Sequence, residues 1–462
     1  MIPLIATSTP LQLIQKYNVA GPRYTSYPAV PFWENENLPA STWASHLQST
    51  FSATNQSRGL SLYVHLPYCE SLCTFCACHK RITKNHSVEE PYIEALLNEW
   101  AMYKQQFKTA PHIAEIHLGG GTPSFFSPEN LQKLIKGLLT GATIASNHEF
   151  GFEGHPNNTT EAHLQTLFEL GFRRVSFGVQ DYDPQVQRAI HRIQPFEQVK
   201  QVTALARRIG YTSISHDLVF GLPFQSLESI QYTVEQTITL RPDRLAFYSY
   251  AHVPWLKGNG QRGFEDHDLP SGAQKRALYE LGRSLFEANG YHEIGMDHFA
   301  LSTDSMTESM LNGTLHRNFM GYTTTQSKLM IGLGASAISD AWSAFAQNKK
   351  GIDDYLADVN RGELPLLRGH VLNQEDLFIR QQILNLICQF KTTWSSADWG
   401  SNELENLLHR LEVFKEDNLL DFTPTSVRIH PQGRPFIRNI CMAFDKRLLR
   451  ANPKQALFSQ TI

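Results

Sequence analysis

Short apolar runs alternate with longer amphipathic stretches through the middle of the chain, between residues 60 and 250. The short runs predict β-strands, and the longer stretches, where apolar residues recur at helical spacing, predict amphipathic helices. The six expected strands cover 60–66, 115–118, 149–153, 174–179, 213–220 and 244–250. The helices expected between them cover 91–107, 128–139, 161–170, 196–209 and 229–240. This alternation predicts βαβ units and a parallel sheet.

The chain has a different texture on either side of this region. Residues 1–59 are mainly loop-like, and residues 252–370 are irregular and rich in Gly, His and aromatic residues. Helical patterns outside the central region cover 41–51, 273–288, 374–390 and 404–417. Short segments at 422–438 suit a hairpin. We therefore expect a small, mainly helical C-terminal domain after the α/β region.

The composition is that of a soluble globular protein, since 41% of the 462 residues are hydrophobic and 18% are charged. This length predicts two or three domains, or one barrel with additions. No apolar stretch approaches the roughly 18 residues of a membrane span. No basic region precedes an apolar core at the N-terminus, so we expect a cytoplasmic protein without an export signal. The net charge of −3 gives no electrostatic footprint for nucleic acid.

Four of the six cysteines lie within ten residues, directly after the first expected strand. Cys69, Cys73 and Cys76 have the spacing C-x3-C-x2-C, and Cys78 follows two residues later. Three thiolates on one tight loop suit a cubic iron–sulfur cluster and leave its fourth iron without a protein ligand. An iron atom with an open site can bind and activate a small molecule, so we interpret this loop as the centre of the chemistry.

These cysteines have other interpretations. A disulfide framework does not suit a long chain with few cysteines and no secretory signal. Structural zinc needs four N or S ligands, which Cys78 or His79 could complete, so zinc stays open as a less favoured alternative. Cys78 lies too close in sequence to be a comfortable fourth cluster ligand, and we interpret it as a neighbour of the site. Cys388 and Cys441 lie in apolar helical sequence and are expected to be buried small hydrophobic residues.

Polar residues and glycines follow the other expected strands. In a parallel barrel the carboxyl ends of the strands meet at one end, where ligands bind. The strand ends carry Gly119 to Pro123, Glu153, Gln180 with Asp181, Asp217, and Ala251 with His252. Each has an ordinary explanation by itself: the glycine turn lacks the G-x-G-x-x-G and G-K-[ST] fingerprints, and carboxylates suit ion pairs at a barrel rim. Their common position beside the cysteine loop favours one site, where the glycines would let a ligand lie against the backbone.

Further segments add a resemblance to a known family. They are the cysteine loop and residues 21–28 (Gly-Pro-Arg-Tyr-Thr-Ser-Tyr-Pro), 119–123, 178–181, 221–223, 250–252, 295–299, 316–319 and 437–441. With these motifs the chain resembles radical S-adenosylmethionine (SAM) enzymes, and among them the oxygen-independent coproporphyrinogen III oxidases. The cysteine spacing alone specifies only the superfamily, and the terminal segments are much narrower signals.

The resemblance implies an α/β fold: a partial (βα)6 radical SAM barrel with an N-terminal extension and a small, mostly helical C-terminal domain. The extension, at 1–55, would cover the active site, and the barrel would occupy 56–300. A connecting segment at 301–370 would complete the barrel, and the C-terminal domain would occupy 371–462.

The resemblance also implies a [4Fe–4S] cluster held by Cys69, Cys73 and Cys76, and two SAM molecules. The first SAM would contact Tyr63, Gly120, Glu153 and Ile338. The second would be lined by Phe75, Gly121, Thr122, Gln180, Arg192, Asp217 and Ala251. The residue types suit these roles, since carboxylates can hold ribose hydroxyls or an amino group and arginine can pair with a carboxylate. Arg23 in the N-terminal segment would contact the substrate.

The implied activity is the oxidative decarboxylation of two propionates of coproporphyrinogen III to vinyl groups, giving protoporphyrinogen IX in haem biosynthesis without oxygen. A porphyrinogen substrate, a reducing donor such as flavodoxin or ferredoxin, and a monomeric state are implied with it. Ala77, where glycine is common in the family, and His155 depart from the family pattern without removing a ligand. Alternative functions are a related haem-binding chaperone, a haem-modifying radical SAM enzyme, and a zinc-stabilised barrel with another activity.

Overall fold

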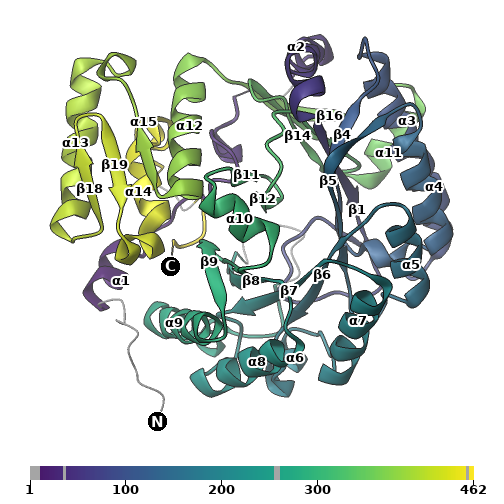
Figure 1. Cartoon of the computed structure of the whole chain (residues 1–462), viewed down its shortest axis with the longest axis horizontal. Coiled ribbons are helices and arrows are strands. Elements are labelled where there is room, and N and C mark those ends of the chain that lie inside the picture. The colour runs from purple at the N-terminus through teal and green to yellow at the C-terminus, as the bar shows by residue number, and fades with distance from the viewer. Residues whose placement is uncertain (1–10, 35–37, 254–260, 454–456, 462) are drawn as a thin grey trace.

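A twelve-stranded sheet organises the part of the chain that the computed structural model describes, residues 11–34, 38–253, 261–453 and 457–461 (Figure 1). Seven neighbouring strands run parallel in the order β13-β1-β4-β5-β6-β7-β8. The six expected strands are confirmed as β1 (Leu60–Leu66), β4 (His112–Gly120), β5 (Thr143–Gly154), β6 (Arg174–Gln180), β7 (Ser213–Phe220) and β8 (Arg244–Ser249). Their carboxyl ends therefore lie along one rim of the curved sheet.

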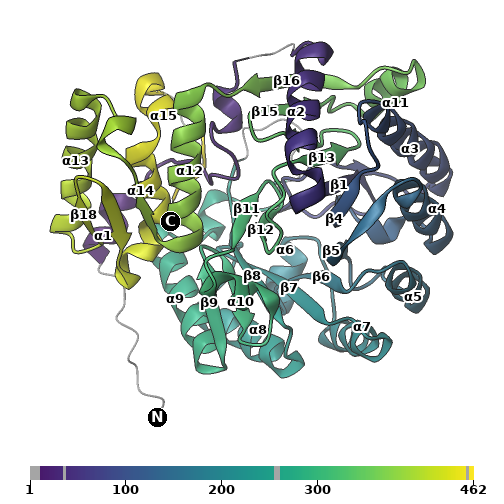
Figure 2. The ribbon, with the colours of Figure 1, turned by 45° about the horizontal axis from the view of Figure 1, so that its top comes forward.

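Helices on the outer side of the sheet connect these strands, as Figure 2 shows. The five expected helices are confirmed as α3 (Glu89–Gln105), α4 (Pro128–Leu139), α5 (Glu161–Glu169), α7 (Phe196–Ile209) and α8 (Leu227–Leu240). Ser127 caps α4, Thr160 caps α5 and Ser226 caps α8. Each side chain accepts a hydrogen bond from the backbone N–H three residues later. Such caps satisfy amides that a helix leaves free at its start. The sequence pattern did not reveal the short helix α6 (Pro184–Ala189).

The segment 252–370 is more regular than expected. On one edge of the sheet, β13 (Met330–Leu333) pairs with β1 and is followed by β14 (Ile338–Asp340), β15 (Ala344–Asn348) and β16 (Leu366–Val371). On the other edge, β10 (His298–Leu301) and β9 (Tyr291–Gly295) continue from β8. The expectation of irregular structure was wrong because these strands are short. The residues of β13 and β15 are also buried on both faces, so they lack the alternation that marks a half-exposed strand.

The remaining elements of this segment are helices and a small hairpin. The expected helix at 273–288 is confirmed as α9 (Gly272–Ala288). The sequence pattern did not show α10 (Ser305–Leu311), α11 (Ile352–Asn360), β11 (His316–Asn318) or β12 (Gly321–Thr323).

The described N-terminal residues form two α-helices, α1 (Leu11–Tyr17) and α2 (Ala40–Arg58), and the second is longer than the expected stretch. Residues 1–10 of the expected extension lie outside the described residues. Between these helices the chain passes along the C-terminal part, where Arg438 donates to carbonyl oxygens of Gly21 and Pro22.

The C-terminal part is mainly helical, as expected, and lies to one side of the barrel in Figure 1. It contains α12 (Gln374–Gln389), α13 (Ser401–Glu416), α14 (Ile437–Phe444) and α15 (Lys446–Ala451). The expected hairpin is present as β18 (Leu420–Thr423) and β19 (Ser426–Ile429), joined by β17 (Lys391–Thr393). Cys388 and Cys441 are buried in its hydrophobic core, as predicted.

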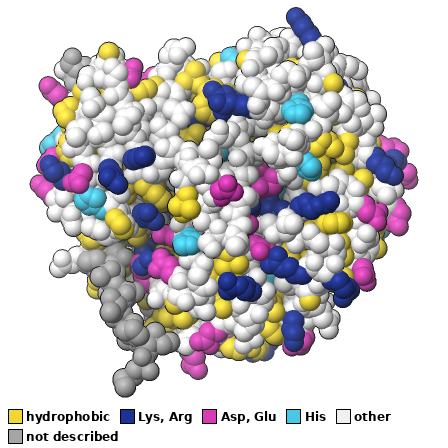
Figure 3. All heavy atoms as spheres, viewed as in Figure 1, with side chains coloured by type: hydrophobic (Ala, Val, Ile, Leu, Met, Phe, Trp, Pro, Cys, Tyr) yellow, Lys and Arg dark blue, Asp and Glu magenta, His cyan; other side chains and the backbone are white. Residues whose placement is uncertain are grey.

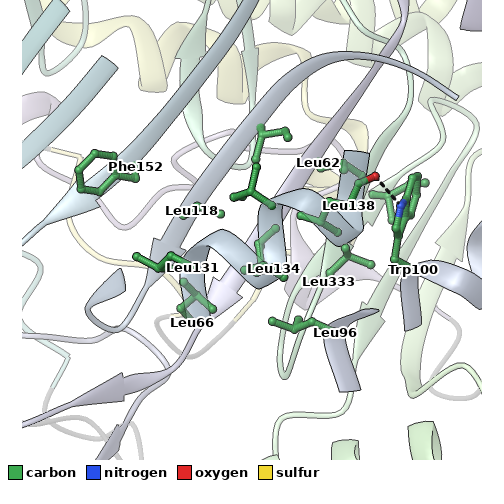
Figure 4. Close-up of a cluster of buried hydrophobic side chains, with 14 of the residues drawn as sticks. Leu62, Leu66, Leu96, Trp100, Leu118, Leu131, Leu134, Leu138, Phe152 and Leu333 are labelled. Carbon is green, nitrogen blue, oxygen red and sulfur yellow. Dashed lines mark hydrogen bonds between the residues drawn. The ribbon is translucent and has the colours of Figure 1, made fainter. Parts of the chain in front are cut away.

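A larger core lies between the sheet and helices α3 and α4 (Figure 4). Leu62, Leu118 and Leu134 are fully buried there, and the indole of Trp100 donates to the carbonyl oxygen of Leu138 at 3.0 Å. Burying one such leucine stabilises the fold by roughly 1.5–3 kcal/mol. This core holds the parallel strands against their helices and so fixes the rim on which the polar residues stand.

The surface carries mixed charges, and Figure 3 shows basic and acidic side chains interspersed over the face in view. This agrees with the small net charge of −3. Among the described residues, no helix combines the length and apolar character needed to cross a membrane.

We predict that Leu134→Ala lowers the free energy of unfolding by roughly 2–5 kcal/mol, because it removes fully buried methyl groups and leaves a cavity. Leu227→Ala is the matched control, since Leu227 is 52% exposed and its truncation should change stability by less than about 0.5 kcal/mol. Urea unfolding followed by circular dichroism measures both variants. Equal losses in the two variants would contradict the placement of Leu134 in the core.

Candidate functional site

A cavity of about 730 Å³ opens at the carboxyl ends of the parallel strands. The structure brings most of the predicted site residues to its wall. They are Arg23, Cys69, Cys73, Phe75, Cys76, Gly120, Gly121, Thr122, Glu153, Gln180, Arg192, Asp217 and Ala251. They come from the N-terminal segment and from the ends of β1, β4, β5, β6, β7 and β8, so the strand register gathers residues that are far apart in sequence.

Tyr63 and Ile338 are not among the residues that line this cavity. The Tyr63 hydroxyl lies 3.0 Å from Nδ1 of His65. Ile338, on β14, packs against the apolar cluster around Trp33 and Phe345. Their expected contacts with SAM therefore stay predictions.

The cysteine loop is anchored at both ends and in its middle. At its ends, the Arg81 amide donates to the carbonyl of Pro67 at 2.8 Å, and the Thr83 amide donates to the carbonyl of Cys69 at 2.9 Å. In its middle, the Thr74 hydroxyl donates to the carbonyl oxygen of Ala189 at 2.8 Å. These bonds fix the positions from which the thiols face the cavity.

Two of the expected ligand sulfurs accept hydrogen bonds from cavity residues. The Thr122 hydroxyl donates to the sulfur of Cys69 at 3.2 Å, and Arg192 approaches the sulfur of Cys73 at 3.7 Å. Burial raises the pKa of the Cys69 thiol to about 11, although the bond from Thr122 opposes that shift. These donors favour the thiolate form that a metal needs.

Cys76 has a different neighbour. A hydrogen bond from the Cys78 thiol holds the pKa of Cys76 below its usual value, against the effect of burial. The ammonium of Lys80 donates to the carbonyl oxygens of both cysteines, at 3.0 and 3.3 Å. Cys78 thus stands beside Cys76 as a donor, the arrangement expected of a neighbour of the ligand set.

The residues present fit an iron–sulfur cluster. The six cysteines are free thiols. Within the described ranges, no three His, Cys, Asp or Glu side chains are placed to hold a single metal ion. A cubic cluster does not require such a group, because each thiolate binds a different iron atom. The anchored loop and the cavity in front of it leave room for the cluster and for a ligand at its open iron.

The glycine turn after β4 is required by the packing of the protein itself. Gly120 has a φ of +109°, and a Cβ there would lie 2.5 Å from the His65 ring. A Cβ on Gly121 would lie 2.6 Å from the backbone of Pro67. Both distances are too short for a side chain, so the turn lies directly against the strand that leads into the cysteine loop. The fold itself therefore requires these glycines, in addition to the access to the backbone that we expect them to give a ligand.

Two carboxylates face the cavity and are held differently. Glu153 accepts hydrogen bonds from the His117 ring at 3.1 Å and from the Gly120 amide at 3.2 Å. Burial would raise the pKa of Glu153, but these bonds outweigh it and hold the pKa below its usual value. Burial raises the pKa of Asp217 to about 6, with the charge of Glu153 adding to the shift and a bond from Ser176 opposing it.

Arg192 and Arg23 bring positive charge to the cavity. Arg192 donates to the carbonyl oxygen of Gly178 at 2.6 Å, which directs its guanidinium towards the cysteine loop. Arg23 donates to the carbonyl oxygen of Ser249 at 2.9 Å and lies 3.5 Å from the carboxylate of Asp297. Both groups suit an anionic ligand.

The cavity also has lining residues that the sequence did not reveal as site residues. They are Lys80, Lys84, Tyr248, Tyr250 and Gln261, among others. Tyr248 and Tyr250 belong to the sixth expected strand and its end, so alternation along that strand could have indicated them. Gln261 lies in a segment without periodicity, and no sequence signal marked it.

Comparisons with known proteins give a consistent result. The sequence model of the radical SAM superfamily matches residues 63–237. Over 458 residues the chain is 37% identical to the oxygen-independent coproporphyrinogen III oxidase of Pseudomonas aeruginosa and 38% identical to that of Helicobacter pylori. Each alignment covers 97% of this chain and 98% of the relative.

A solved structure is similar along nearly the whole chain. It is the coproporphyrinogen III oxidase (HemN) of Escherichia coli, described there as a radical SAM enzyme. The TM-score is 0.87 at 35% identity, and the match covers 95% of this chain and 98% of that one.

We predict that Arg438→Leu exposes the N-terminal segment to protease. The buried guanidinium donates to the Pro22 carbonyl at 3.1 Å and to the carbonyls of Gly21 and Gln460, so its loss leaves several acceptors unsatisfied. Chymotryptic cleavage near Tyr24 should accelerate at least about tenfold, because local opening becomes easier. Arg428→Leu, an exposed arginine in the same part of the chain, is the control. Unchanged protection would show that Arg438 does not hold this segment.

Proposed function

Because this chain belongs to the family of oxygen-independent coproporphyrinogen III oxidases, we propose that it converts two propionate side chains of coproporphyrinogen III to vinyl groups, forming protoporphyrinogen IX. The observation that carries this proposal is similarity over almost the full length of both chains. It includes the terminal segments as well as the cysteine loop that the whole superfamily shares. The reaction is an oxidation that belongs to haem biosynthesis and uses no molecular oxygen.

The family uses a [4Fe–4S] cluster and SAM. Most of the residues proposed to hold them line the cavity, and Tyr63 and Ile338 do not. Cys69, Cys73 and Cys76 are the proposed cluster ligands. When bound, the cluster and SAM supply one-electron chemistry that can remove a hydrogen atom from the β-carbon of a propionate. A second SAM, on the residues from Phe75 to Ala251 named above, is part of the proposal.

The cavity residues have roles that follow from their chemistry. Glu153, held ionised by its hydrogen bonds, suits the amino group of the first SAM. The Arg192 guanidinium suits the carboxylate of the second SAM, and the ring of Phe75 suits its adenine. Arg23, at the edge of the cavity on the N-terminal segment, suits a substrate propionate.

The proposal extends to the surroundings of the reaction. Cleaving SAM to a radical would consume one electron, so the cycle needs a reducing donor such as flavodoxin or ferredoxin. Each propionate loses CO2, a hydrogen atom and one electron when it becomes a vinyl group. An electron acceptor must also take the electron that the substrate gives up. A cytoplasmic monomer completes the proposal, since reduced thiols and an oxygen-sensitive cluster suit that compartment.

Cysteine replacements test the proposed ligand set. Cys69→Ser, Cys73→Ser and Cys76→Ser should each retain less than roughly half of the iron that the wild-type protein binds, about four atoms per chain. Cys78→Ser is the matched control on the same loop and should keep its iron, because its thiol only donates to Cys76. Iron and sulfide analysis after anaerobic reconstitution measures this. Iron loss in Cys78→Ser would place Cys78 among the ligands, and zinc without iron or sulfide in the wild-type protein would overturn the cluster.

The activity itself is tested by anaerobic incubation with coproporphyrinogen III, SAM and a reductant. We expect vinyl products and 5′-deoxyadenosine to form together, and neither to form with Cys73→Ser. Chromatography with mass spectrometry follows both products. Deoxyadenosine without a vinyl product would indicate another substrate for the same chemistry, and tight haem binding with neither product would favour the haem-chaperone alternative.

A further inference from the structure

Three positions on the inner face of β5 form a row that side chains of the neighbouring strands complete. Glu149, Gly151 and Glu153 alternate along the strand, so they share one face. In the register of the sheet, Gly151 pairs with His117 on β4 and with Arg174 on β6. The glycine therefore stands between a histidine and an arginine, with a carboxylate two residues away on either side.

Because Gly151 has no side chain, Arg174 and His117 can meet in the space beside it. Arg174 reaches across it and donates from Nη2 to Nδ1 of His117 at 3.4 Å. A Cβ on Gly151 would lie only 3.0 Å from Nε of Arg174. A glycine inside a strand weakens the strand, so this one marks a close approach.

The contacts continue to both carboxylates. Nε of Arg174 lies 3.1 Å from Oε1 of Glu149, and Nε2 of His117 lies 3.1 Å from Oε1 of Glu153. A chain of polar contacts thus runs from Glu149, inside the barrel, through Arg174 and His117 to Glu153 at the cavity. Glu149 also contacts Arg244, at 3.4 Å, and accepts from the Thr324 hydroxyl at 2.9 Å. Glu149 therefore has partners besides Arg174. Pairing with Glu149 does not by itself explain why Arg174 also contacts His117.

The direction of these hydrogen bonds determines which ring nitrogen of His117 carries the proton. A guanidinium can only donate hydrogen bonds, so Nδ1 of His117 accepts from Arg174. The proton of the neutral ring must then be on Nε2, from which it is donated to Glu153. The other carboxylate oxygen of Glu153 accepts from the Gly120 amide at 3.2 Å. Both oxygens are directed by the protein, while 44% of the Glu153 side chain remains exposed towards the cavity.

A second strand glycine makes room for this arrangement. A Cβ on Gly119 would lie 2.7 Å from Oε1 of Glu153, the oxygen that His117 contacts. The His117 ring also stacks on Tyr63, with ring centroids 6.2 Å apart and planes 16° from parallel. The glycines at 119 and 151 therefore leave room for the chain of contacts, and Tyr63 packs against the His117 ring at its centre.

We propose that His117 and Arg174 are positioning residues that hold the Glu153 carboxylate in the orientation that binds the amino group of SAM. The inference rests on the proposed function, because that function gives Glu153 its ligand. Arg174 donates to Nδ1 and so leaves the ring proton on Nε2, from which His117 donates to the carboxylate. Gly151 provides the space in which Arg174 and His117 meet.

The test is the affinity for SAM of the anaerobically reconstituted protein, measured by equilibrium binding. His117→Phe keeps an aromatic ring against Tyr63 but removes both nitrogens, and it should weaken SAM binding about 10- to 100-fold. His117→Gln is the conservative control, since its amide can donate to Glu153, and its affinity should stay within about threefold of wild type. A side chain that served only the fold would not show this rescue. Iron content and thermal stability confirm that each variant is loaded and folded.

A double variant tests whether the effect passes through Glu153. If it does, adding His117→Phe to Glu153→Gln should weaken SAM binding no further than Glu153→Gln alone. Gly151→Ala tests the same prediction by a second route, because the three atoms nearest to its methyl group would all belong to the Arg174 guanidinium, 3.0–3.1 Å away, which must then move. It should weaken SAM binding, and it decides the matter if His117→Phe does not load iron.

The outcomes separate this inference from the proposed function. A wild-type protein that carries the cluster and does not bind SAM would overturn the proposed function. If the wild-type protein binds SAM, and His117→Phe, His117→Gln and Gly151→Ala all bind it as tightly as the wild-type protein does, the inference is overturned and the proposed function is not. Unchanged affinity in Glu153→Gln would also overturn it, because the carboxylate would then have no part in SAM binding.

Discussion

The site depends on the close approach of two strand ends, the loop after β1 and the turn after β4. The Gly121 amide donates to the carbonyl of Leu66 at 2.8 Å, and the Thr122 amide donates to that of Tyr68 at 3.0 Å. Only glycine fits at 120 and 121, since a Cβ there would meet His65 or Pro67. The same approach carries the Thr122 hydroxyl to the sulfur of Cys69 and the Gly120 amide to Glu153. Cluster loop, glycine turn and carboxylate are therefore one packed unit, and a change in any of them moves the others.

The inner face of the sheet carries charges that must be paired because they are removed from water. Arg244 is buried and contacts both Asp304, at 2.7 Å, and Glu149. Burial opposes these charges, but the two arginines hold the pKa of Glu149 at about 2. Such buried pairs contribute little net stability, since desolvation offsets much of the attraction. Their consequence is orientation: paired charges lock the inward side chains of β5 and β6, and Glu153 at the rim is the last of them.

The sequence predicted the features that repeat locally or that lie close together in the chain. Six strands and five connecting helices could be found because each is long enough to show its period. The cysteine loop could be found because its spacing is itself the chemistry. Strands such as β14, which carries Ile338, were missed because a strand of three residues is too short to show alternation. The contact between His117 and Arg174 could not be predicted, because it exists only in the register of three strands around a glycine that has no side chain to signal it.

The site is completed by two kinds of contact that form over very different distances in the sequence. The cysteine loop is held by residues near it and by neighbouring strands, so the barrel alone positions it. Arg438, more than four hundred residues after Arg23, holds the carbonyls of the segment directly before it, and Arg23 lines the cavity. Tyr24 adds a bond to Asp445 at 3.0 Å across a similar separation. Closing such long loops costs conformational entropy, which the buried contacts of the C-terminal core must offset. The barrel can therefore form the metal site by local contacts, whereas the wall that would face the substrate requires the whole chain to be folded.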